Sequence, residues 1–197
     1  ERRYEYDAAG NRTAVIDETG NRTAFEYDEY GYLLSRTDPD GRSERYRYDA
    51  EHRVIAVTDR AGQTTTYHRS GEPITQIRHP DGKIERFGYD PRGRLLEHTD
   101  AAGHVTRYAY DSAGALTDAW SPEGARISRC YDQLGRLVSF TDACGLTITY
   151  ERRADGRVTR AADSSGRSTS YAYDEAGRHI AVTGWDGRTV QYTYDLM

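Results

Sequence analysis

The sequence predicts an all-β protein: a repetitive ribbon of antiparallel β-hairpins, with about 18 or 19 short strands, that curls into a spiral or partial shell. Three observations predict it. The dipeptide Tyr-Asp recurs along the chain, an Asp-x-x-Gly turn signal falls midway between its copies, and the segments between turns alternate aromatic and polar residues. Internal repetition at a fixed period is the signature of a repeat architecture.

The Tyr-Asp dipeptide sets the period, because five successive steps between its copies are 21 residues long. The whole of residues 1–197 is expected to be a single array of about nine such repeats, cut from a larger protein. Two diverged copies are expected at Tyr67-His68 and Tyr150-Glu151. The residues expected to carry the structural repeat signature are Tyr6, Asp7, Tyr27, Asp28, Tyr48, Asp49, Tyr89, Asp90, Gly93, Tyr110, Asp111, Tyr131, Asp132, Gly135, Tyr173, Asp174, Gly177, Tyr194 and Asp195.

The Asp-x-x-Gly signal predicts a hairpin turn, as in Asp17-Glu-Thr-Gly20 and Asp100-Ala-Ala-Gly103. Asp favours the first position of a type I turn and Gly the fourth. The Asp carboxylate accepts a hydrogen bond from the backbone N–H two residues on. The Gly then takes a left-handed conformation and closes the hairpin with a bulge.

The segments between turns are short and β-rich, and their aromatics alternate, as in Tyr108/Tyr110 and Tyr171/Tyr173. A period of two places each pair on one face of a strand. Hydrophobic residues make up only 36% of the chain. Rows of aromatic rings, worth about 0.2–1 kcal/mol per facing pair, are therefore expected to order the sheet, with the hydroxyl ends in water.

Composition and charge limit the classes of partner that the chain is expected to bind. The net charge is -5, with acids and bases interspersed throughout and no basic stripe, which argues against nucleic acid as a partner. No apolar run is long enough to predict a membrane span. Cys130 and Cys144 are expected near opposite ends of a hairpin and hence unpaired.

No residue pattern predicts catalysis or metal binding. The turn itself explains the many Asp residues. The six His are scattered without zinc-like spacing, and no Ser lies in a Gly-x-Ser-x-Gly elbow. We therefore expect no enzyme activity, no cofactor, and no catalytic, cofactor-binding or metal-binding residue.

The repeat unit resembles the YD repeat of Rhs proteins, wall-associated proteins, insecticidal toxin-complex components and teneurins. Two stretches match it closely: Tyr89-Asp-Pro-Arg-Gly93-Arg94-Leu95-Leu96 and Tyr131-Asp-Gln-Leu-Gly135-Arg136-Leu137-Val138. The resemblance covers essentially all of the chain and weakens at 67–77 and 150–158. The Arg-rich, Lys-poor composition is more similar to bacterial Rhs proteins than to animal teneurins.

The resemblance implies a non-catalytic segment of an Rhs-type β-shell that encapsulates a C-terminal toxin for delivery to competitor or host cells. The parent protein would be secreted or on the cell surface, as a polymorphic toxin of interbacterial competition exported by contact-dependent or type VI secretion. Its partners would be the toxin domain and further YD repeats of its own polypeptide.

Two further expectations concern binding. The open strand edges of the array favour edge-to-edge self-association. The alternative function is a cell-surface module that binds carbohydrate, or mediates adhesion, through its aromatic rows.

Overall fold

A computed structural model describes residues 1–195, and these residues form nineteen β-strands and no helix. The predicted all-β hairpin ribbon is confirmed. No helix of the described residues could cross a membrane. Leu196 and Met197, which follow the last Tyr-Asp dipeptide, lie outside the described residues.

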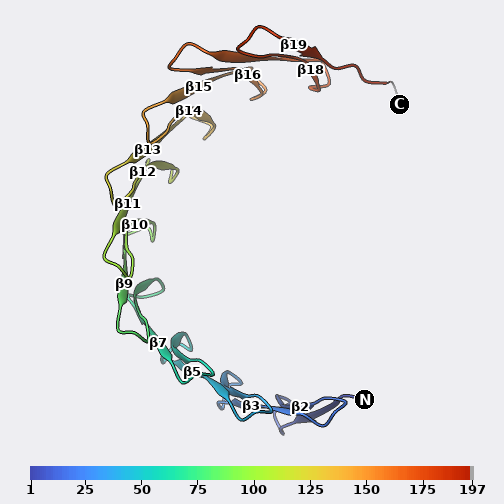
Figure 1. Ribbon diagram of the computed structural model, residues 1–197, viewed down its shortest axis with the longest axis vertical. Coiled ribbons are helices and arrows are strands. Elements are labelled where there is room, and N and C mark those ends of the chain that lie inside the picture. Colours follow the sequence, from blue (N-terminus) through green and yellow to red (C-terminus); the bar gives the residue numbers. More distant parts are fainter. Residues whose placement is uncertain (196–197) are drawn as a thin grey trace. The chain divides into compact units, whose positions relative to one another are not determined.

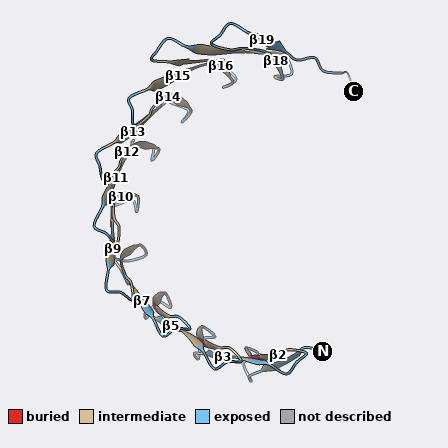
Figure 2. Ribbon diagram, viewed as in Figure 1, coloured by how far each residue is buried: buried red, intermediate tan, exposed pale blue. Residues whose placement is uncertain are grey.

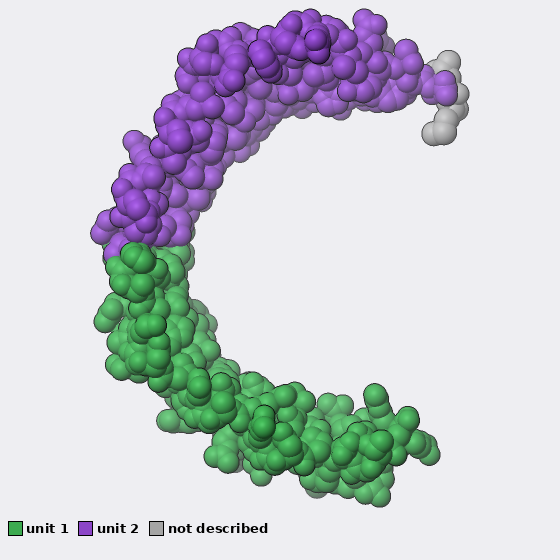
Figure 3. All heavy atoms as spheres, in the orientation of Figure 1, with its two compact units in different colours: residues 1–104 green, residues 105–197 purple. Residues whose placement is uncertain are grey.

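The chain divides into two compact units, residues Glu1–His104 and Val105–Met197, which are described separately (Figure 3). The strands of the first unit are β1 (Arg3–Tyr6), β2 (Arg12–Ile16), β3 (Arg22–Tyr27), β4 (Leu33–Thr37), β5 (Ser43–Tyr48), β6 (Val54–Thr58), β7 (Thr64–Arg69), β8 (Ile74–Arg78), β9 (Ile84–Tyr89) and β10 (Leu95–Thr99).

The second unit repeats the same short strands. They are β11 (Val105–Tyr110), β12 (Leu116–Trp120), β13 (Arg126–Tyr131), β14 (Leu137–Thr141), β15 (Thr147–Arg152), β16 (Val158–Asp163), β17 (Ser168–Tyr173), β18 (His179–Thr183) and β19 (Thr189–Gln191).

Within each unit, every strand pairs antiparallel with its neighbours in sequence, so the ribbon is a simple meander (Figure 1). Two kinds of hairpin alternate. After an odd-numbered strand the register shifts just before the last residue, as between Glu5 and Tyr6. After an even-numbered strand it does not shift. A bulge in every second hairpin increases the local twist of the ribbon.

The ribbon has no deep core. The described residues include three buried ones, Ala14 (0% exposed), Ala56 (3%) and Ser35 (7%), and no large side chain is fully buried (Figure 2). The accessible surface is 13352 Å². A compact monomer of 22.3 kDa would expose only about 9,400 Å². Order in this chain must come mainly from hydrogen bonds and contacts between neighbouring repeats.

The strand ladder separates two faces. What we call the polar face carries small and charged side chains at ladder positions such as Ala14, Ala24, Ser35, Arg45 and Thr66 in the first unit. The other, aromatic face carries larger side chains such as Val15, Phe25, Tyr46, Val57 and Phe87. On the polar face, hydroxyls of facing residues hydrogen-bond across four even-to-odd hairpins, at Thr37–Ser43, Thr58–Thr64, Thr141–Thr147 and Thr183–Thr189.

Candidate functional site

The predicted turn chemistry is confirmed, and Asp132 illustrates it. The backbone N–H of Gly135 donates to the Asp132 carbonyl at 2.9 Å, and the Asp132 N–H donates to the Arg136 carbonyl at 2.9 Å. The carboxylate Oδ1 of Asp132 accepts from the N–H of Leu134, two residues on, at 2.9 Å. Gly135 has a φ of 74°, the left-handed conformation that closes the hairpin.

A fifth turn residue, for which the sequence pattern predicted no role, strengthens this arrangement. The N–H of Arg136 donates to the same Oδ1 of Asp132 at 2.9 Å, and its Nε donates to Oδ2 at 2.7 Å. Asn11 pairs with Asp7 in the same way, and Arg178 with Asp174. The signal was visible as the recurring Arg or Asn directly after the turn glycine.

These hydrogen bonds act on the titration of the turn carboxylates. Backbone N–H donation from His104 lowers the pKa of Asp100 to about 2, with a further hydrogen bond from the His104 side chain. The Ser165 hydroxyl, helped by Arg167, lowers the pKa of Asp163 to about 2. Each of these turns is therefore most stable with its carboxylate ionised.

The structure places seven of the signature aspartates at the first position of a turn between an odd-numbered strand and the next even-numbered one, and the tyrosine before each of these seven ends the odd-numbered strand. Tyr194 and Asp195 instead lie beyond the end of β19 and begin no turn in the described part of the chain. Tyr6, in the first repeat, is 61% exposed. Tyr110 is half-buried at the end of β11.

Six of the signature tyrosines join one repeat to the next through a contact that we call the tyrosine clamp. Each hydroxyl donates to the backbone carbonyl 15 residues earlier, at the start of the preceding even-numbered strand. The pairs are Tyr27–Arg12 (3.1 Å), Tyr48–Leu33 (2.8 Å), Tyr89–Ile74 (3.0 Å), Tyr131–Leu116 (3.1 Å), Tyr173–Val158 (2.8 Å) and Tyr194–His179 (2.8 Å).

The clamp supplies a partner that the strand ladder does not. Arg12 lies beyond the last ladder pair of β2 with β3, Ala14–Ala24, so the Arg12 carbonyl has no ladder partner on that side. The hydroxyl of Tyr27 fills the position. A backbone carbonyl left without a partner costs free energy, so the bulge and the tyrosine complement each other.

The fifth turn residue of one repeat also covers the clamp ring of the next. The guanidinium of Arg178 lies 4.5 Å from the centre of the Tyr194 ring, and that of Arg157 lies 5.9 Å from the Tyr173 ring. Tyr32 takes this position against Tyr48, with ring centres 5.4 Å apart. Each clamp is thus built from two successive repeats, through cation–π or ring contacts.

The clamp corrects the expectation of aromatic rows with water-facing hydroxyls. In the clamp tyrosines the hydroxyl is bonded to backbone rather than directed to water. Several of the rings contact arginine or histidine instead of the equivalent tyrosine of the next repeat. Repeat-to-repeat hydrogen bonds therefore replace much of the stacking that the sequence pattern predicted.

The predicted positions of the two diverged copies are wrong by two residues. The turn after β15 begins at Arg153, whose carbonyl accepts from Gly156, so the clamp position is Arg152 and not Tyr150. Arg152 donates through Nη2 to the Leu137 carbonyl at 2.9 Å, again 15 residues earlier. In the other copy the turn begins at Ser70, which places Arg69 at the equivalent position. A strict 21-residue step from Tyr131 or Tyr48 would have found both.

One turn replaces its glycine with histidine. His52 has a φ of 58° and is the one non-glycine residue with positive φ among the described residues. Its ring stacks on Tyr32 at 4.6 Å and meets Tyr30 edge-on at 4.5 Å. These ring contacts offset the strain of a left-handed conformation.

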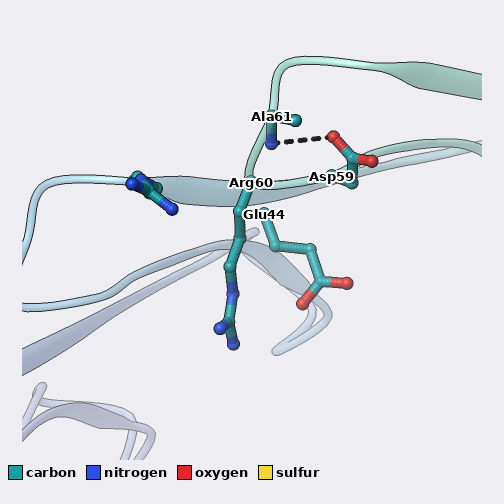
Figure 4. Close-up of a pocket in the computed structure, with 5 residues that line it drawn as sticks. Glu44, Asp59, Arg60 and Ala61 are labelled. Atoms are coloured by element: carbon teal, nitrogen blue, oxygen red, sulfur yellow. Dashed lines mark hydrogen bonds between the residues drawn. The ribbon is translucent and has the colours of Figure 1, made fainter.

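The surface carries several shallow hollows, some over turns and some over strands. One of about 530 Å³ is lined by Arg42, Glu44, Asp59, Arg60 and Ala61. Figure 4 shows the Arg60 and Glu44 side chains extending on the same side of the turn, while Asp59 is engaged with the Ala61 N–H at 2.8 Å. Arg60 also pairs with Asp38 at 2.9 Å. These groups stabilise turns and form no nucleophile–base pair.

Two other sequence expectations concern metals and thiols. Among residues 1–195, no three His, Cys, Asp or Glu side chains come together to hold a metal ion. Cys130 and Cys144 are both free and exposed. The prediction that they do not bridge is confirmed.

Comparisons with known proteins agree with this geometry. The family model described as Teneurin YD-shell matches residues 3–150, and the one described as RHS Repeat matches residues 154–189. No curated protein matches the chain.

Solved structures share the fold. The crystal structure titled TcdB2-TccC3 aligns with a TM-score of 0.65 and 19% identity, over 93% of this chain and 12% of that one. The structure of TcdB2-TccC3 without its hypervariable C-terminal region aligns with a TM-score of 0.58 and 18% identity, over 93% and 11%. The present chain thus spans about an eighth of the length of these neighbours.

Proposed function

The chain belongs to the Teneurin YD-shell family, and from this premise we propose that it is a structural wall segment that encloses another part of its own polypeptide. The observation that carries the proposal is the tyrosine clamp. It joins each repeat to the next without a deep core, so the ribbon extends by adding repeats at its ends.

A wall of this kind needs no catalytic group. The most recurrent polar side chains of the array, the turn aspartates, are occupied by backbone N–H groups and by the fifth turn residue. The clamp hydroxyls are bonded to carbonyls. The residues that recur in every repeat therefore stabilise the ribbon, and the proposed mechanism is passive exclusion of solvent and proteases from what lies behind it.

The proposal extends to the cargo. A C-terminal toxin domain is the segment that we propose to be enclosed, with delivery to competitor or host cells and secretion or surface display of the parent protein. The structural similarity to the TcdB2-TccC3 toxin proteins supports a toxin-related shell. The export route proposed from the sequence resemblance, contact-dependent or type VI secretion, differs from the setting that these neighbours represent.

The rival function, carbohydrate binding through aromatic rows, has weaker support. A ring that stacks on a sugar needs a free face. The clamp rings of Tyr173 and Tyr194 are instead covered by Arg157 and Arg178. Exposed aromatics at the repeated Tyr-x-Tyr slot lie in the first and last repeats of the described chain, at Tyr4, Tyr6, Tyr192 and Tyr194, whereas Tyr30 and Trp185 lie in turns.

The test is limited proteolysis of the full-length parent protein and of a variant lacking residues 111–131. The deletion removes one whole repeat and joins Tyr110 to Asp132, so the Tyr-Asp turn is kept. In the parent, the repeats and the enclosed segment should resist cleavage together. In the shortened variant, the repeats should stay resistant while the enclosed segment is cut, because a wall missing one repeat no longer closes.

A matched control is Tyr108→Phe, since the Tyr108 hydroxyl makes no hydrogen bond among the described residues and the wall should stay closed. Circular dichroism would establish that both variants keep their β-structure. Rapid cleavage of the C-terminal segment in the unmodified parent, with the repeats intact, would show that the array folds without enclosing anything.

A further inference from the structure

A cluster of four exposed arginines lies on the polar face of the first unit, over strands β5 to β9. They are Arg45, Arg47, Arg78 and Arg86. The clustering cannot be seen in the linear sequence, because successive residues of a strand lie on opposite faces of the ribbon. The exposed side chain of His68, on β7, lies on the same face. We call these five residues the arginine stripe.

The ladder register fixes the spacing within the stripe. Pairs Arg47–Ala56, Ala56–Thr66 and Thr66–Arg78 place Arg47 and Arg78 on one row, three strand spacings or about 14 Å apart. Arg45 and Arg47 are alternate residues of one strand, about 7 Å apart. Arg78 and Arg86 are diagonal neighbours on adjacent strands, about 7–8 Å apart.

None of the four arginines forms an ion pair among residues 1–195. This sets them apart from other arginines of the polar face. Arg22 pairs with Glu5 at 2.9 Å, Arg126 with Asp118 at 2.7 Å, and Arg160 with Glu151 at 2.9 Å. Other arginines of the polar face are therefore neutralised by ion pairs, whereas the four stripe arginines between β5 and β9 are not.

No acidic side chain of β5 to β9 shares the polar face with the stripe. The nearest ones on that face are Glu26 on β3, which accepts from Ser35 at 2.8 Å, and Glu97 on β10. Like charges on neighbouring strands repel, so the stripe lowers the stability of the free ribbon. An anionic partner would relieve that repulsion.

The surface between the arginines is a shallow trough of small residues. Ala56 is only 3% exposed, and it lines a hollow of about 360 Å³ together with Arg47, Thr66 and His68. A second hollow, of about 480 Å³, is lined by Arg45 and Arg47 with Ser35, Thr58 and, at its β3 side, Glu26. An extended chain laid in the trough would bring its side chains between the guanidinium groups.

We propose that the arginine stripe is a binding site for an acidic, extended polypeptide segment. Four residues of an extended peptide laid across the strands span the roughly 14 Å from Arg47 to Arg78. Arg45, about 7 Å from Arg47 along β5, lies beside that path. Guanidinium groups bind carboxylates through paired hydrogen bonds. Single-stranded nucleic acid fits less well, because His68 is the one aromatic side chain on the polar face of β5 to β9 in the described part of the chain, and stacking of successive bases needs several rings.

The experiment measures binding of a fluorescein-labelled oligoglutamate peptide to the 197-residue chain by fluorescence anisotropy, at low and moderate salt. One variant changes the four stripe arginines to glutamine: Arg45→Gln, Arg47→Gln, Arg78→Gln and Arg86→Gln. The control makes the same change of net charge at paired arginines of the polar face: Arg3→Gln, Arg22→Gln, Arg126→Gln and Arg160→Gln.

The stripe variant should bind the peptide about tenfold or more weakly, and the control should stay within about twofold of the unmodified chain. Binding by the unmodified chain should weaken with salt. Equal losses in both variants would mean that net charge alone attracts the peptide and would overturn the site. Stripe-dependent binding that is tighter for oligothymidylate or heparin than for the peptide would overturn the choice of ligand. Neither result depends on whether the shell encloses cargo.

Discussion

At the level of single residues, the clamp tyrosine is the most informative side chain of the repeat. Its ring ends an odd-numbered strand, and its hydroxyl satisfies a carbonyl of the preceding repeat, as Tyr131 does for Leu116 at 3.1 Å. When arginine replaces it at position 152, the long side chain still reaches the equivalent carbonyl. The position thus requires a hydrogen-bond donor on a side chain long enough to reach the carbonyl of the preceding repeat, and an aromatic ring is not essential.

Replacing Tyr131 by Phe removes that donor and leaves the Leu116 carbonyl without it. We expect the free energy of unfolding to fall by about 1 kcal/mol. Tyr108→Phe, two strands earlier in the same unit and without a hydroxyl hydrogen bond, should change it by much less. Urea denaturation of the two variants makes the comparison, and equal losses would mean that ring burial, not the clamp, is what the mutations disturb.

The turn glycines give a second prediction at this scale. Gly135 has a φ of 74° with open space where a Cβ would sit, so Gly135→Ala should cost about 1 kcal/mol through backbone strain alone. Gly88 lies within strand β9 without a positive φ, and its Cβ would meet Glu97 at an ordinary 3.7 Å. Gly88→Ala should therefore be neutral or stabilising. Thermal unfolding monitored by circular dichroism distinguishes the two, and a stabilised Gly135→Ala would contradict the assigned turn geometry.

At the level of the element, most hairpins are held by an ionised aspartate that serves several N–H donors. Because the folded pKa of Asp100 and Asp163 is about 2, below the ordinary value of 3.8, the unfolded chain binds protons first as the pH falls. The stabilisation is therefore complete above about pH 5 and is lost between about pH 4 and pH 2.

Urea midpoints measured from pH 6 downward should stay level to about pH 5 and then fall steeply. The variant Asp163→Asn should show a shallower fall, since one of the titrating turns has been removed. A midpoint that does not change between about pH 5 and pH 2 would show that the turn carboxylates are not coupled to folding.

The hairpins also show which features the sequence could predict. The turns can be predicted from the sequence, because the preference of Asp and Gly for fixed turn positions depends only on local backbone geometry. The clamp could not be read in this way, since it joins Tyr131 to a carbonyl 15 residues away across a bulge that no residue type marks. The arginine stripe likewise depends on strand register, which places Arg47 and Arg78 on one row.

At the level of the whole molecule, stability and function both rest on contacts between neighbouring repeats. With three buried residues among those described, the chain has no central core to protect. Its first and last strands, β1 and β19, each pair with one neighbour only in the described part of the chain. These open edges keep self-association as a prediction for the isolated chain, and in a longer parent they are the places where further repeats would add.

The proposed wall has a direct consequence for its two faces. In a closed shell one face of the ribbon looks into the enclosed space and the other looks outward. Val190 and Gln191 are adjacent exposed residues of β19 that lie on the aromatic and the polar face respectively. A cysteine at either position therefore reports the accessibility of one face.

The most direct measurement places Val190→Cys or Gln191→Cys in the full-length parent, with Cys130, Cys144 and any other native cysteine replaced by serine, and compares labelling by a bulky polyethylene-glycol maleimide. In the isolated 197-residue chain both cysteines should react, which serves as the control for intrinsic reactivity. In the parent, we expect only the cysteine on the outward face to react with the bulky reagent, and a small maleimide should label that cysteine as well as the bulky one does. Equal labelling of both faces of the parent by the bulky reagent would contradict a closed wall.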